Sequence, residues 1–213
     1  MIRIATKRQI ASELARHAPF TATGALTGIA IMAAIIFAHV PSSVSATVFY
    51  VLHPLHIALS AIVTTGMYRK HGGKAKWAFL VGYVGTIGPC TLSDVILPYL
   101  GGTLVGAKME LDICFIEEWW LVNPAALAGI AIGYWRTITR LPHYGHVLLS
   151  TWASLFYLAA FGVANWLPLL VFVFPILFVA VWLPCCFSDI VFPLLFVRDE
   201  HQRRQLSLEH ADH

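Results

Sequence analysis

Six long apolar runs restrict this chain to one class of fold. They lie at about 20–40, 44–67, 77–97, 119–135, 141–163 and 167–197. The hydrocarbon core of a bilayer is roughly 30 Å thick, and an α-helix crosses it with about 20 residues. With 58% hydrophobic and 12% charged residues, the chain also has too much apolar surface for a soluble fold. We therefore predict an all-α polytopic membrane protein with six transmembrane helices.

The charged residues indicate how the six spans are oriented. If the N-terminus is cytoplasmic, every Lys and Arg except Lys108 falls on the cytoplasmic side, so we expect both termini there. The orientation of the chain in the lipid bilayer therefore explains where the basic residues lie. They give no reason to expect a nucleic-acid partner. The segment between the third and fourth spans is acidic instead, with Glu110, Asp112, Glu117 and Glu118. This outer face either concentrates cations at an entrance or is a solvated loop.

Three motifs recur in the same order in the two halves of the chain. They are Gly-Ile-Ala-Ile at Gly28 and Gly129, His-x-x-His-x-x-Leu-Ser at His53 and His143, and Pro-Cys-x-x-Ser-Asp-x-x-x-Pro at Pro89 and Pro184. Each half has three spans, an odd number, so the second half enters the bilayer in the opposite direction. We therefore predict two inverted three-helix repeats, a plan in which binding sites form between the repeats.

The repeat divides the chain into five parts. They are a cytoplasmic amphipathic lead-in (1–19), a first three-helix repeat (20–98), an acidic outer loop (99–118), a second three-helix repeat (119–197) and a cytoplasmic tail (198–213). The last span contains Pro175, Pro184 and Pro193, so we expect it to be kinked or broken.

Ionisable residues inside membrane spans are costly and indicate a functional site. The repeats contain six of them: His53, His56, Asp94, His143, His146 and Asp189. Histidines at i and i+3 share a helix face, and a carboxylate from the next helix completes a His-His-Asp set in each half. Such nitrogen and oxygen ligands suit several transition-metal ions, and the set does not choose among them. The alternative is that these residues only lock the helices together by hydrogen bonds, with Ser60, Ser93, Ser150 and Ser188 as supporting polar partners.

Cys90 and Cys185 occupy equivalent places in the two halves, each directly after a proline. They could be soft metal ligands, a redox pair that cycles between dithiol and disulfide, or small packing residues. The two His-Asp sets lie at different depths along their spans. They either converge on one centre or form two separate sites.

Several functions agree with this pattern. The leading hypothesis is a transporter or carrier of a divalent transition-metal ion, coupled to protons because histidine titrates near neutral pH. The alternatives are a membrane-embedded metalloenzyme acting on a lipid-soluble substrate, a thiol-disulfide carrier that uses Cys90 and Cys185, and a non-catalytic membrane subunit. No phosphate-binding loop or nucleophile elbow occurs in a plausible context, so conventional soluble enzyme chemistry is not indicated. The sequence leaves open whether the chain is an enzyme of another kind. A homodimer is compatible with six spans, although no motif requires it.

Overall fold

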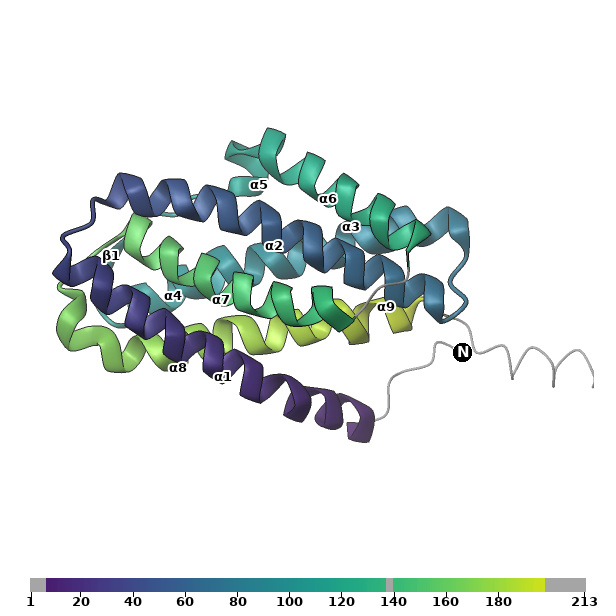
Figure 1. Ribbon diagram of the computed structural model, residues 1–213, viewed down its shortest axis with the longest axis horizontal. Coiled ribbons are helices and arrows are strands. Elements are labelled where there is room, and N and C mark those ends of the chain that lie inside the picture. The colour runs from purple at the N-terminus through teal and green to yellow at the C-terminus, as the bar shows by residue number, and fades with distance from the viewer. Residues whose placement is uncertain (1–6, 137–139, 198–213) are drawn as a thin grey trace, which may run out of the picture.

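The chain folds into a bundle of helices that run along its longest axis (Figure 1), and the computed structural model describes residues 7–136 and 140–197. The long helices are α1 (Lys7–Phe37), α2 (Ser42–Lys70), α3 (Ala75–Thr91), α6 (Trp119–Trp135), α7 (Arg140–Phe161) and α8 (Trp166–Cys186). The shorter elements are the π-helical turns η1 (Leu92–Ile96) and η2 (Phe187–Val191), the helices α4 (Leu97–Leu104), α5 (Cys114–Glu117) and α9 (Phe192–Leu195), and the strands β1 (Lys108–Met109) and β2 (Gly162–Val163). A lipid bilayer favours helices, because each helix satisfies the hydrogen-bonding groups of its own backbone.

Four helices are long and apolar enough to cross a membrane. They are Ala18–Phe37, Ser42–Lys70, Ala75–Leu104 and Trp166–Leu195. Helix α6 has 17 residues and α7 has 22, and Gly145–Phe161 of α7 is a shorter apolar helix among the residues whose side chains the structure describes. Seventeen residues are about the minimum for a crossing, so length alone does not make α6 a span. The all-α prediction is confirmed, with four helices that could span a bilayer.

The helix bounds agree closely with the apolar runs, with two differences. Helix α1 begins at Lys7 and continues through Pro19, so residues 7–19 of the expected lead-in belong to the same helix as the first apolar run. The last long segment, which was expected to be kinked or broken, is helical through Pro175 and Pro184 and then widens into the π-helical turn η2. The expected tail, 198–213, lies outside the described residues.

Helices α2 and α7 lie side by side at the centre of the bundle (Figure 1). Helix α6 packs along α2, whereas α1 packs along α7 and α8. The first helix of each half therefore lies against the second helix of the other half. Small residues permit the approach of α6: a Cβ atom at Gly129 would lie 2.3 Å from the carbonyl oxygen of Ala58.

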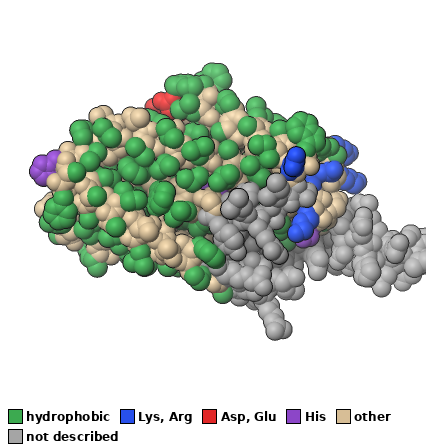
Figure 2. Space-filling model, viewed as in Figure 1, with side chains coloured by type: hydrophobic (Ala, Val, Ile, Leu, Met, Phe, Trp, Pro, Cys, Tyr) green, Lys and Arg blue, Asp and Glu red, His purple; other side chains and the backbone are tan. Residues whose placement is uncertain are grey.

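The polarity of the bundle suits lipid as its surroundings. Large apolar side chains such as Phe37, Trp135 and Val171 are exposed, while polar side chains such as those of His56, Thr64 and Asp94 are buried between the helices. Figure 2 shows hydrophobic side chains over the flank that faces the viewer and Lys and Arg gathered at one end. We call this the basic end. At the other, acidic-loop end, β1 pairs antiparallel with β2, which ties the segment after α4 to the end of α7.

Candidate metal centre

Two helices and two π-helical turns bring ionisable side chains together at the middle of the bundle. Helix α2 carries His53 and His56, η1 carries Asp94, α7 carries His146 and η2 carries Asp189. None of the five is more than 1% exposed. The thiols at the ends of α3 and α8 border them. We call the seven residues the central cluster: His53, His56, Cys90, Asp94, His146, Cys185 and Asp189.

Prolines explain why both aspartates sit in a π-helical turn. Pro98 has no N–H group, so the carbonyl of Asp94, four residues earlier, loses its helical partner; Pro193 does the same to Asp189. The helix widens, and the Leu97 N–H group donates to the carbonyl oxygen of Leu92, five residues back. Such turns are frequent at functional sites. Here they occur at equivalent places in the two halves.

Asp94 organises the first part of the cluster. Its Oδ2 atom accepts from Nδ1 of His53 at 2.8 Å and from Nδ1 of His56 at 2.7 Å. Its Oδ1 atom accepts from the hydroxyls of Ser93 and Ser150, both at 2.7 Å. A carboxylate has no proton to donate, so both histidines carry their proton on Nδ1. In the neutral ring the lone pair is then on Nε2, the nitrogen that points away from Asp94.

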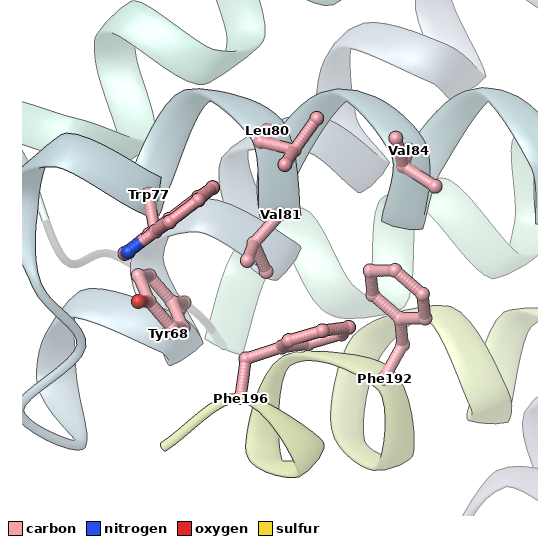
Figure 3. Close-up of a pocket in the computed structure, with 7 residues that line it drawn as sticks. All are labelled: Tyr68, Trp77, Leu80, Val81, Val84, Phe192 and Phe196. Carbon is pink, nitrogen blue, oxygen red and sulfur yellow. The ribbon is translucent and has the colours of Figure 1, made fainter. Parts of the chain in front are cut away.

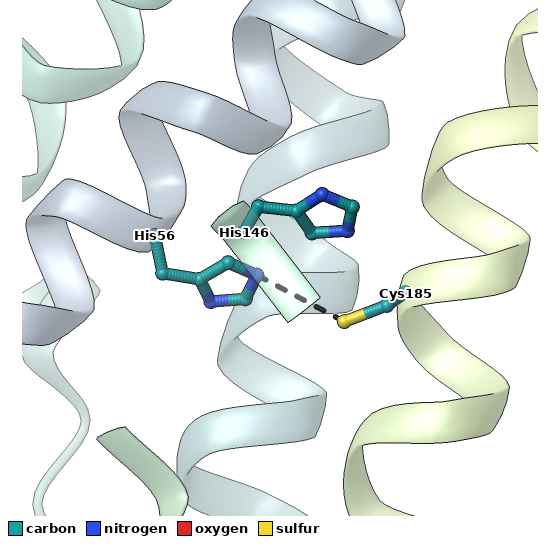
Figure 4. Close-up of side chains that lie close together, drawn as sticks. All are labelled: His56, His146 and Cys185. Atoms are coloured by element: carbon teal, nitrogen blue, oxygen red, sulfur yellow. Dashed lines mark hydrogen bonds between the residues drawn. The ribbon is translucent and has the colours of Figure 1, made fainter. Parts of the chain in front are cut away.

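The Nε2 atom of His56 faces sulfur from both halves of the chain. It lies 3.7 Å from Sγ of Cys90 and 3.9 Å from Sγ of Cys185. The His56 ring also stacks on the His146 ring, with centroids 5.7 Å apart and planes inclined by 8°. Figure 4 shows the two rings side by side and the Cys185 thiol directed at His56. The described residues include all four cysteines, and no disulfide joins any of them.

A second carboxylate serves the other half. Nε2 of His146 lies 3.1 Å from Oδ2 of Asp189, so the middle of the bundle holds a histidine–carboxylate pair from each half. The hydroxyl oxygens of Ser60 and Ser188 lie 3.1 Å apart, and those of Ser150 and Ser93 lie 3.3 Å apart. Each serine of a His-x-x-His helix thus contacts the Ser-Asp turn of the opposite half.

Two further hydroxyls also contact the Ser-Asp turn of the opposite half, and neither was predicted from the sequence. Thr64 donates to the carbonyl oxygen of Ser188 at 3.3 Å, and Ser154 donates to the carbonyl oxygen of Ser93 at 3.0 Å. Both bonds reach backbone groups of a π-helical turn, which have imperfect helical partners. The sequence did indicate both hydroxyls, because Thr64 follows Ser60 by four positions and Ser154 follows Ser150 by four.

Two groups in the cluster have the donors and spacing to hold a metal ion. They are His53 with His56 and Asp94, and His56 with His146 and Cys185; within each group the ligand atoms lie within 4.8 Å of one another. The first offers nitrogen and oxygen, the second nitrogen and sulfur. Because His56 belongs to both, and its Nδ1 already binds Asp94, the Nε2 side that faces the thiols is the one left for a metal.

The sequence-predicted residues converge on one cluster as far as the structure describes them. The His56 ring stacks on the His146 ring, and the Ser150 hydroxyl donates to Asp94, so the two sets meet at one depth. The side chain of His143 lies outside the described residues. The sequence grouped each aspartate with its histidines, and the structure places both pairs in contact.

The four acidic residues of the outer segment lie apart from the central cluster. Asp112 accepts from the Tyr50 hydroxyl at 2.7 Å, and the Tyr157 hydroxyl donates to the carbonyl oxygen of Glu110 at 3.0 Å. Burial, reinforced by the charge of Asp112, raises the pKa of the Cys114 thiol, which therefore stays protonated. Desolvation, followed by repulsion from Asp112 and Glu117, raises the pKa of Glu118. Glu117 is exposed.

Two apolar grooves lie on the sides of the bundle. One of about 680 Å³ is lined partly by Gly88, Pro89, Pro184 and Cys186, directly beside the two cysteines of the cluster. The other, of about 370 Å³, lies near the basic end between α3 and α9 (Figure 3). Tyr68, Trp77 and Phe192 line it, and none of the cluster residues does.

Comparison with known proteins adds no assignment. No protein-family model, no curated protein and no solved structure matches this chain. The functional argument therefore rests on the cluster itself.

Proposed function

We propose that this chain is a membrane carrier of a transition-metal ion, held between its two halves by His56, His146, Cys90 and Cys185. The observation that carries the proposal is the position of His56 Nε2, which faces one thiol from each half in a fully buried place. An ionisable group at such a place costs free energy unless it has a functional partner.

The ligand set favours a soft or borderline ion. Two thiolates and two imidazoles form the tetrahedral environment that Zn²⁺ adopts, and thiolates also bind Cu⁺. Asp94 and Asp189 then act as outer partners, since each accepts from or faces a histidine of the set. Carboxylates in that position fix the orientation of ligating histidines and raise their basicity. This changes the role first expected of the aspartates, from ligands to orienting groups.

The carrier hypothesis includes six spans arranged as two inverted repeats. Three observations support the repeat: the π-helical turns at equivalent places, the crossed packing of α6 on α2 and α1 on α7, and the matched serine contacts between halves. The gathering of Lys and Arg at one end supports a cytoplasmic location for that end and for both termini. A site on the axis between the halves would open to either side as one half rocks against the other.

Metal binding by purified protein tests the proposal. We expect wild-type protein to bind one Zn²⁺ or Co²⁺ per chain, with the intense sulfur-to-metal absorption of thiolate-bound Co²⁺. Cys90→Ser and Cys185→Ser should each weaken binding by more than about tenfold. Cys186→Ser is the matched control, because Cys186 is similarly buried, directly follows Cys185 in α8 and is not one of the four proposed ligands. Unchanged binding in both thiol variants would refute the site, and absence of ion uptake in reconstituted vesicles would refute transport.

One observation favours a membrane-embedded metalloenzyme as a second candidate. The larger apolar groove reaches Pro89 and Pro184, the residues just before the two cysteines, and so would give a lipid-soluble substrate sideways access to the metal. A Cβ atom at Gly88, which lines the groove, would meet no atom within 4 Å, so Gly88→Leu places its side chain in the groove. This variant should keep ion transport if the chain is a carrier, and lose turnover if it is an enzyme.

A further inference from the structure

Nε2 of His53 has no hydrogen-bond partner among the described residues, in a side chain that is 0% exposed. Buried polar atoms are nearly always bonded, so an orphaned one requires an explanation. In the neutral ring, Nδ1 donates to Asp94 and the orphaned Nε2 atom carries the lone pair.

His53 lies between the proposed ion site and the acidic-loop end. It precedes His56 by three residues on α2, so the two rings lie on one helix face about one turn apart. Tyr50 is a further three residues toward the loop, and its hydroxyl donates to Asp112. A line of polar groups therefore leads from Asp112 and Tyr50 to His53 and on to His56.

Three aromatic rings interrupt this line. The Phe49 ring stacks on the His53 ring with centroids 5.3 Å apart and planes inclined by 17°. It also meets Tyr157 at 5.3 Å and Phe161 at 5.7 Å, both edge-on. We call Phe49, Tyr157 and Phe161 the aromatic plug. Phe49 contacts both His53 and Tyr157, and the Tyr157 hydroxyl bonds to the loop, so these buried rings lie between His53 and the loop.

We propose that His53 is a transit ligand, through whose Nε2 atom a metal ion passes between the acidic-loop end and the central site, and that the aromatic plug closes this route in the present conformation. This proposal rests on the carrier function. The carrier proposal concerns the site where the ion is held, whereas this one concerns the path by which the ion reaches that site. It gives the orphaned lone pair a use: brief coordination while the ring of Phe49 is displaced.

Two substitutions separate this role from the hydrogen bond to Asp94. Asn at position 53 can place its amide N–H near the position of Nδ1, and so keeps a donor to Asp94 while it removes Nε2. Gln at position 53 can place a polar atom near Nε2 and loses the donor at Nδ1. The pair therefore distinguishes a transit ligand from a residue that only orients Asp94.

The measurement is stopped-flow mixing of purified protein with Co²⁺, followed by equilibrium titration with the same ion. We expect His53→Asn to bind one Co²⁺ with unchanged absorption bands but to associate about tenfold more slowly. His53→Gln should retain more of the rate than His53→Asn. Phe49→Ala should accelerate association several-fold, because it opens the plug. Phe79→Ala is its control, since Phe79 is an exposed ring of α3 away from the cluster.

The outcomes distinguish this proposal from the carrier function beneath it. If wild-type protein binds no Co²⁺, the metal site itself is refuted. If wild-type protein binds Co²⁺ and His53→Asn associates at the wild-type rate, the transit role is overturned and the central site stands. Loss of equilibrium binding in His53→Asn also overturns it, because His53 would then belong to the resting site. Slower association with intact equilibrium binding supports it.

Discussion

At the scale of single residues, Asp94 connects the described parts of the central cluster. Its two oxygens accept from two imidazoles and two hydroxyls, and one of those hydroxyls, from Ser150, comes from the other half of the chain. A buried carboxylate is tolerable only when its oxygens are satisfied in this way. The same bonds fix the proton of His56 on Nδ1 and so present Nε2 to the thiols.

Asp94→Asn should weaken metal binding without removing a proposed ligand. The asparagine NH₂ group would face an Nδ1–H donor, so at least one histidine must change its tautomer or turn away. We expect a loss of about 10- to 100-fold in affinity, the usual effect of removing a carboxylate behind a metal-bound histidine. Competition with a chromophoric chelator measures it. Asp112→Asn, which removes a carboxylate outside the cluster, should leave the affinity unchanged. Equal affinities of wild-type protein and Asp94→Asn would show that Asp94 does not orient the ligands.

The sequence was sufficient to identify these residues but not their geometry. Repetition selected His56, Cys90, Asp94, His146 and Cys185, because rare polar residue types recurred at fixed spacing in apolar runs. Which ring nitrogen faces Asp94, and that both thiols face one imidazole, depend on contacts between helices distant in the chain. Pairwise spacing within one helix carries no information about those contacts.

At the scale of elements, the π-helical turns are the feature that the apolar pattern could not reveal. An apolar run looks the same whether the helix inside it has regular or widened turns. Helix α6, by contrast, was predicted with its observed bounds, Trp119–Trp135, because Glu118 and Arg136 enclose the apolar run. The prolines did signal an irregularity, and four residues before each of Pro98 and Pro193 lies the aspartate of a π-helical turn.

Pro98→Ala should therefore raise stability and lower metal affinity. Alanine restores the N–H group that the Asp94 carbonyl lacks, which favours a regular helix by up to about 3 kcal/mol. A regular turn would rotate Asp94 away from His53 and His56. Thermal unfolding in detergent and a Zn²⁺ titration measure the two effects. Pro175→Ala changes a proline of α8 outside the π-helical turns, so it should leave affinity unchanged. A Pro98→Ala protein that keeps wild-type affinity would show that the turn does not position the carboxylate.

At the scale of the whole molecule, the charge of the centre limits what it can carry. The cluster lies in a low-dielectric interior, where a change in net charge is costly. When a divalent ion binds two thiols, each thiol loses one proton, so two positive charges enter and two leave. A monovalent ion would not balance in this way. The proposed site therefore favours exchange of one divalent ion for two protons.

Such an exchange predicts that transport is independent of membrane potential. In vesicles reconstituted with the protein, Zn²⁺ should enter at the same rate when a potassium gradient with valinomycin sets the potential positive, zero or negative inside. A pH indicator trapped in the vesicles should report two protons leaving for each ion that enters. Cys90→Ser vesicles control for leakage, since the variant lacks one of the two exchanging thiols. A rate that follows the potential, or Zn²⁺ entry without proton efflux, would mean that the thiols do not surrender both protons, and the balance of charge would have to come from Asp94 or Asp189 instead.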